Sequence, residues 1–171
     1  MKKRLILPAF AAAIIIGALV FIYPLSFSKI VADDSELIIV IVEKGDEPVY
    51  PNGQVNESTR EYRFNPEAEA FMQIRQILSN HSYHRSLRTF QSDNSLLIND
   101  RYYLNLYSGK NLIATGGTNE IRVNYRIHNI GYFGYGAAFS MMDEIKSVLD
   151  LCEPFWENNS GSFPSSNTDM R

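Results

Sequence analysis

An uncharged run from Leu5 to Phe27 constrains this chain more than any other feature. Lys2, Lys3 and Arg4 stand directly before it. A helix over the whole run would be about 35 Å long, whereas the hydrocarbon core of a bilayer is about 30 Å thick. A helix that is apolar on every side is unusual for a small domain. The run therefore predicts a transmembrane helix, with the membrane as a partner through residues 5–27.

Charge on the two sides of the run predicts an orientation. The basic residues are expected in the cytoplasm, and Asp33 and Asp34 are expected outside. The predicted localisation is a single-pass protein of the cell membrane with an extracytoplasmic C-terminal domain. A retained signal anchor is favoured, because a signal peptide has a shorter apolar region of about 7–15 residues. The alternative is a secreted protein cut after Ser28, where Ser26 and Ser28 are small.

Composition limits the remaining classes. The formal net charge is −3, and no cluster of Lys and Arg follows the first four residues, so nucleic-acid binding is not expected. Cys152 is the single cysteine, which excludes an internal disulfide. It falls on the apolar stripe of an expected helix, and we interpret it as an inert buried thiol.

A strand and a helix are the clearest elements of the first half. LIIVIV, from Leu37 to Val42, is aliphatic and mostly β-branched, which predicts a buried strand. Asn65 is suited to cap a helix that starts at Pro66, and the acidic Glu67 suits the positive end of the helix dipole. Apolar residues then follow at helical spacing. An amphipathic helix is therefore expected over about residues 66–79.

Extended segments dominate the second half. RYYLNLY (101–107) and LIAT (112–115) flank a hairpin loop, and EIRVNYRIH (120–128) has the most regular strand pattern. If 120–128 is one strand, alternate side chains face opposite ways, which leaves Arg122, Arg126 and His128 together on a solvated face. A second amphipathic helix is expected over 137–152, before Pro154.

These elements predict an α+β fold. The expected architecture is an antiparallel sheet of about four strands with two amphipathic helices on one face, in the order strand, helix, strands, helix. The predicted domains are a signal anchor or signal peptide at 1–28, a polar spacer at 29–35, an extracytoplasmic α+β domain at 36–153 and a disordered polar tail at 154–171.

Two groups of residues are candidates for binding. A glycine-rich aromatic stretch at 131–136 offers flat binding area, although the same rings would also serve to close the end of the core. The arginines of the 120–128 segment offer positive charge to an anionic partner, and alternation alone also explains them as solvent-facing. The predicted binding residues are Tyr132, Phe133, Tyr135, Arg122 and Arg126.

The histidines are the candidates for a metal or acid–base site. His81 and His84 are three residues apart, and His128 lies far along the chain. A zinc site needs a third ligand, and neither an H-E-x-x-H pattern nor a cysteine pair supplies it. Solvated histidines are the favoured interpretation, so no catalytic residue, metal or cofactor is predicted. The alternative is a small extracytoplasmic hydrolase or metal-binding protein that uses these histidines.

The order of these pieces resembles small exported or membrane-anchored domains of unknown function in Gram-positive bacteria. The pieces are the basic apolar start, LIIVIV, EAFMQIRQIL, RYYLNLY, NEIRVNYRI and the aromatic glycine turn. The resemblance covers most of residues 35–151 and implies an extracytoplasmic location, but it brings no functional residues. The predicted function is a membrane-anchored or secreted, non-catalytic binding module with a protein or cell-envelope partner.

Overall fold

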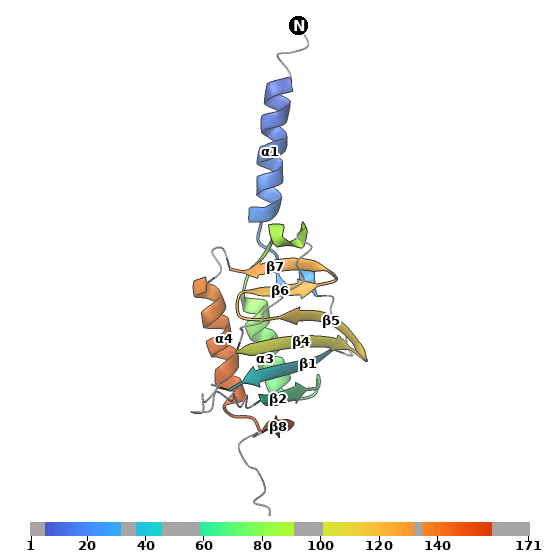
Figure 1. The fold of residues 1–171 in the computed structure, drawn as a ribbon, viewed down its shortest axis with the longest axis vertical. Coiled ribbons are helices and arrows are strands. Elements are labelled where there is room, and N and C mark those ends of the chain that lie inside the picture. Colours follow the sequence, from blue (N-terminus) through green and yellow to red (C-terminus); the bar gives the residue numbers. More distant parts are fainter. Residues whose placement is uncertain (1–5, 32–36, 46–58, 91–100, 132–134, 159–171) are drawn as a thin grey trace, which may run out of the picture.

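An antiparallel sheet forms the body of the protein (Figure 1). The structure is a computed structural model, and it describes residues 6–31, 37–45, 59–90, 101–131 and 135–158. The strands are β1 (Leu37–Lys44), β2 (Thr59–Phe64), β3 (Tyr83–Arg85), β4 (Tyr102–Ser108), β5 (Asn111–Gly116), β6 (Glu120–Val123), β7 (Arg126–Ile130) and β8 (Trp156–Asn158). They lie in the order β3-β7-β6-β5-β4-β1-β2-β8, so β3 and β8 are the two edges.

The helices are α1 (Ile6–Ile22), α2 (Phe27–Ile30), α3 (Glu69–Asn80), η2 (Leu87–Phe90) and α4 (Tyr135–Leu149). Two of them, α3 and α4, cover one face of this sheet, and α1 extends away from it. Figure 1 shows α1 leaving the sheet at the edge next to β7. The 3₁₀-helix η2 lies near the base of α1 and makes contact with β7.

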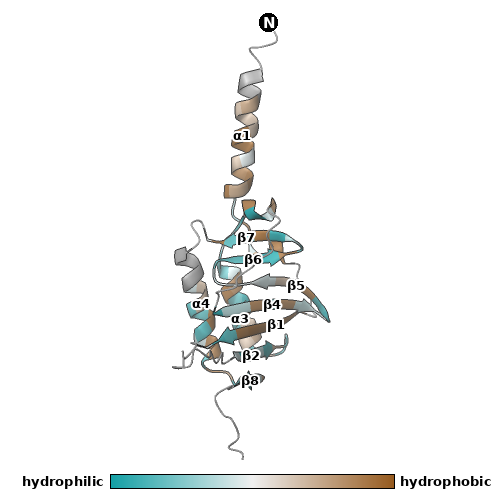
Figure 2. Ribbon diagram, viewed as in Figure 1, coloured by the Kyte–Doolittle hydropathy of each residue, from teal (hydrophilic) through white to brown (hydrophobic). Residues whose placement is uncertain are grey.

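Rows of apolar side chains across the strands build the core. Ile39 on β1 is paired with Phe64 on β2 and with Leu106 on β4, and the row continues through Ala114 to Val123 on β6. Paired residues of antiparallel strands point to the same face, and all five are buried. Figure 2 shows the apolar residues concentrated along β1 and α1. The helices complete this core with Phe71, Ile74, Leu78, Met141, Ile145 and Leu149.

The predicted sheet of about four strands is wrong, because the described chain forms an α+β fold with eight strands and four α-helices. The sequence pattern does not predict β2, β3 or β8. β3 and β8 have three residues each, which is too short for an alternating pattern to be visible. β2 has the sequence TREYRF, in which charged residues fall at most of the positions that are not buried. Its two buried rings, Tyr62 and Phe64, stack with their centroids 6.5 Å apart.

The expected single strand over 120–128 is also wrong, because the chain reverses in its middle. Asn124 and Tyr125 have φ values of 47° and 67°. Two successive residues with positive φ form the tight turn that joins β6 to β7. In the resulting hairpin, Val123 pairs with Arg126 and Arg122 pairs with Ile127. The two arginines therefore lie on opposite faces of the sheet, and not on one solvated face.

The long apolar run is divided in the structure. α1 has 17 residues, which corresponds to about 26 Å at 1.5 Å per residue, less than the ~30 Å of a bilayer core. Among the described residues, no helix is both long and apolar enough to cross a membrane. This finding corrects the prediction of a transmembrane signal anchor. The predicted single-pass membrane localisation depended on that anchor and loses its basis.

The end of the run belongs to the packed part of the molecule. Leu25 forms a β-bridge with Tyr83, with backbone N–H···O distances of 2.7 and 3.0 Å. Phe27, at the start of α2, is only 4% exposed, and its ring lies 6.0 Å from that of Tyr83. Val31 is buried as well. Residues 25–31 thus pack against the sheet edge, in a region that the sequence analysis divides between the apolar start and the polar spacer.

The opposite edge of the sheet is formed by β8. It lies beyond Pro154, where the sequence analysis places a disordered tail. Arg60 on β2 donates a hydrogen bond of 2.8 Å to the carboxylate of Glu157, and the backbones of β2 and β8 pair in antiparallel register. The remaining tail, residues 159–171, lies outside the described residues.

Candidate functional site

Three cationic side chains surround one cavity near the β3–β7 edge of the sheet. Lys29 comes from α2, Arg85 from the end of β3 and Arg126 from the start of β7. The cavity has a volume of about 610 Å³. Its other lining residues carry no carboxylate and are Leu25, Ile30, Val123, Asn124 and His128. We call it the cationic cavity.

Strand register explains how these residues meet. One row of paired residues runs from Ile121 on β6 to His128 on β7 and then to Arg85 on β3. The neighbouring row ends with Val123 opposite Arg126. Since paired residues share a face, both arginines and the histidine lie on the same face as the apolar core. The two rows of core residues therefore end, near the edge of the sheet, in the cationic side chains of Arg85 and Arg126.

The segment between α1 and α2 brings the lysine to this edge. The Leu25–Tyr83 bridge and the buried ring of Phe27 hold the segment against β3. Tyr83 is itself fixed, because its hydroxyl donates a 2.8 Å hydrogen bond to the carbonyl of Leu78 on α3. Burial raises the pKa of this hydroxyl, so it stays protonated. Lys29 extends from the anchored segment with its Nζ 5.9 Å from the Tyr23 ring.

The cations of the cavity are not neutralised by acidic partners in the described part of the chain. None of Lys29, Arg85 and Arg126 forms an ion pair there. Arg85 donates one hydrogen bond of 2.8 Å to the carbonyl of Val20 at the end of α1. A cavity with several uncompensated positive charges attracts anions, and charge-assisted hydrogen bonds then hold them.

A buried imidazole completes the cavity. His128 is 6% exposed, and its Nδ1 is buried without a hydrogen-bond partner among the described residues. Burial lowers the pKa of His128, and the nearby Arg85 and Arg126 lower it further. The imidazole is therefore neutral at pH 7. A buried polar nitrogen without a partner is costly for a folded protein.

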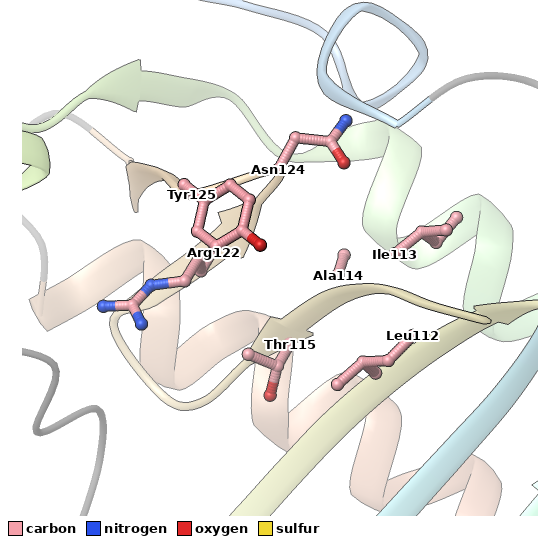
Figure 3. A pocket seen from close by; sticks show the side chains of 7 residues that line it. All are labelled: Leu112, Ile113, Ala114, Thr115, Arg122, Asn124 and Tyr125. Atoms are coloured by element: carbon pink, nitrogen blue, oxygen red, sulfur yellow. The ribbon is translucent and has the colours of Figure 1, made fainter.

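The predicted binding residues are distributed over different parts of the molecule. Arg126 lines the cationic cavity. Arg122 lines a second cavity of about 390 Å³ between β5 and the β6–β7 turn, and Figure 3 shows its guanidinium extending away from Leu112 and Ile113. Tyr132 and Phe133 lie outside the described residues, and Tyr135 is described only as the first residue of α4.

The three histidines do not share a centre. His81 lies beside α4, with its Nε2 3.5 Å from the carboxylate of Glu144. His84 is paired with Asn129, the neighbour of His128, so the two buried histidines point to opposite faces of the sheet. Within the described ranges, no group of three or more His, Cys, Asp and Glu side chains is placed to hold a metal ion.

Sequence reasoning missed Lys29, Arg85 and His128 as members of one site. These residues are far apart along the chain, and the β3–β7 and β6–β7 pairings bring the strand residues among them together. One signal was present in the sequence: the segment from Arg122 to His128 contains no acidic residue, which indicates positive charge without a local partner. No protein family model matches the chain, and no match was found among curated proteins or solved structures.

Proposed function

We propose that this protein is a non-catalytic binding module that holds an anionic group in the cationic cavity. The observation that carries the proposal is the convergence of Lys29, Arg85 and Arg126 without an ion-pair partner among the described residues. His128 lines the same cavity, and its Nδ1 is buried without a hydrogen-bond partner among the described residues. Cationic side chains bind phosphate and carboxylate groups through charge-assisted hydrogen bonds, which require no metal or cofactor.

The alternative of a small hydrolase or metal-binding protein has no support from the described residues, since the three histidines lie apart. Cys152 also gives no support to a nucleophilic role. Burial raises the pKa of its thiol, and the thiol donates a hydrogen bond of 3.3 Å to the carbonyl of Val148. A thiol with a raised pKa is a poor nucleophile.

Titration of the full chain with inorganic phosphate tests the proposal. Arg126→Gln is the cleanest variant, because this side chain is exposed and forms no ion pair among the described residues. We expect it to weaken phosphate binding by about tenfold, the value of one lost charge-assisted contact. Lys110→Gln is the matched control, because Lys110 is an exposed cation in the β4–β5 turn, away from the cavity. Equal phosphate affinity in the wild type and Arg126→Gln would overturn the proposal.

A further inference from the structure

A third, mostly apolar cavity adjoins the cationic cavity. It has a volume of about 380 Å³ and lies between the end of α1, the helix η2 and β7. Arg85, Arg126 and His128 line both cavities. Both volumes fall in the range of about 300–1,000 Å³ that is usual for small-molecule sites. The other residues that line this apolar cavity are Val20, Phe21, Ser86, Thr89, Phe90 and Ile127.

Hydrogen bonds and a ring contact hold the wall of the apolar cavity in place. Thr89 fixes η2 to β7, because its Oγ1 accepts a 2.9 Å hydrogen bond from the Ile127 N–H and lies 3.3 Å from the Ile127 carbonyl oxygen. The Phe90 ring then meets that of Phe21 edge-on, with centroids 6.5 Å apart. Phe90 is nevertheless 79% exposed. A large ring that is held in place and left in water offers apolar contact area to a ligand.

We infer that the ligand is an amphiphilic phosphate monoester, with its phosphate in the cationic cavity and its hydrocarbon chain in the apolar cavity. This inference rests on the proposed function, since it needs the anion to bind first. A phosphate monoester is a dianion near neutral pH, which suits a site with three cations better than a single carboxylate does. The shared residues Arg85, Arg126 and His128 mark the boundary at which the charged group would join the chain.

Comparing octyl phosphate, inorganic phosphate and octanol on the full chain tests the inference. Octyl phosphate should bind at least about tenfold more tightly than inorganic phosphate, because burial of the chain adds to the affinity. Phe90→Ser should remove several-fold of this advantage and leave the affinity for inorganic phosphate unchanged. Phe155→Ser is the matched control, since Phe155 is also an exposed phenylalanine but lies next to β8 at the other edge of the sheet.

The outcomes separate this inference from the proposed function. If octyl phosphate binds no more tightly than inorganic phosphate, the inference fails and the anion site stands. If neither compound binds, both fail. If octanol binds as tightly as octyl phosphate and Arg126→Gln changes neither affinity, the chain is adsorbing to apolar surface such as α1, and the inference is overturned.

Discussion

Arg85 on β3 and His128 on β7 are register partners at the edge of the sheet, and both line the cationic cavity. The pairing places a positive charge beside a buried imidazole. Burial, the charge of Arg85 and the charge of Arg126 all lower the pKa of this histidine. We therefore expect the stability of this edge to depend on pH.

Lowering the pH should destabilise the protein through His128. The pKa of His128 in the folded protein lies below its ordinary value, so the unfolded chain binds the proton more readily. Stability is therefore fully present above the ordinary histidine pKa of about 6.5 and is lost as the pH falls below it. Urea unfolding at about pH 7.5 and about pH 5.5 measures this loss. His128→Gln should show a smaller loss, and an equal loss in this variant would contradict the assignment.

Phe27→Ala should unfold the domain more easily, because Phe27 is buried against Tyr83. Removal of a buried phenylalanine ring costs about 3–5 kcal/mol of unfolding free energy. Phe155→Ala is the control, since this ring is 66% exposed and lies 4.8 Å from the Arg63 guanidinium in a cation–π pair, and a change within about 0.5 kcal/mol is expected. Similar effects of the two substitutions would show that residues 25–31 are not part of the folded unit.

Tyr125→Gly should stabilise the β6–β7 hairpin. Tyr125 has a φ of 67° and is 91% exposed, so it bears backbone strain without burying its ring. Glycine adopts this conformation freely, and Asn-Gly is the preferred sequence for such a turn, so a gain of about 0.5–1 kcal/mol is expected. Tyr125→Ala keeps the Cβ atom and should give no gain. A lower thermal midpoint for Tyr125→Gly would show that the exposed ring contributes to stability.

Arg88→Gln should destabilise the protein by leaving a buried carboxylate without its cation. Arg88 donates a 2.9 Å hydrogen bond to Glu120, whose side chain is almost fully buried and whose other oxygen has no partner in the described chain. The loss should be about 1–3 kcal/mol of unfolding free energy. Adding Glu120→Gln should recover part of it, because the buried group is then neutral. Additive losses in the double variant would argue against a direct interaction.

The sequence predicts the elements whose patterns are local. LIIVIV forms β1, which extends two residues further to Lys44, and the amphipathic 66–79 segment forms α3 at Glu69–Asn80. The start of α3 is later than expected because Ala68 first closes a turn by donating to the Asn65 carbonyl. The β6–β7 turn was not predicted, because neither Asn124 nor Tyr125 is a glycine. Apolar and polar residues alternate without a break through the position where the chain reverses direction.

The site depends on relations that no local pattern carries. Arg126 was predicted from alternation within a single strand, yet its actual neighbours come from β3 and from the segment before β1. Arg85 belongs to a strand of three residues, and Lys29 follows a run that was interpreted as one continuous helix. Long-range pairing decides such a site, because strands that are distant in sequence become neighbours only in the sheet.

The central claim is that the cationic cavity holds an anionic group beside His128. Nuclear magnetic resonance of the imidazole, followed through a pH titration with and without inorganic phosphate, tests it most directly. A bound anion offsets the charges of Arg85 and Arg126, so phosphate should raise the pKa of His128. A His128 pKa that is the same in both titrations would contradict the claim.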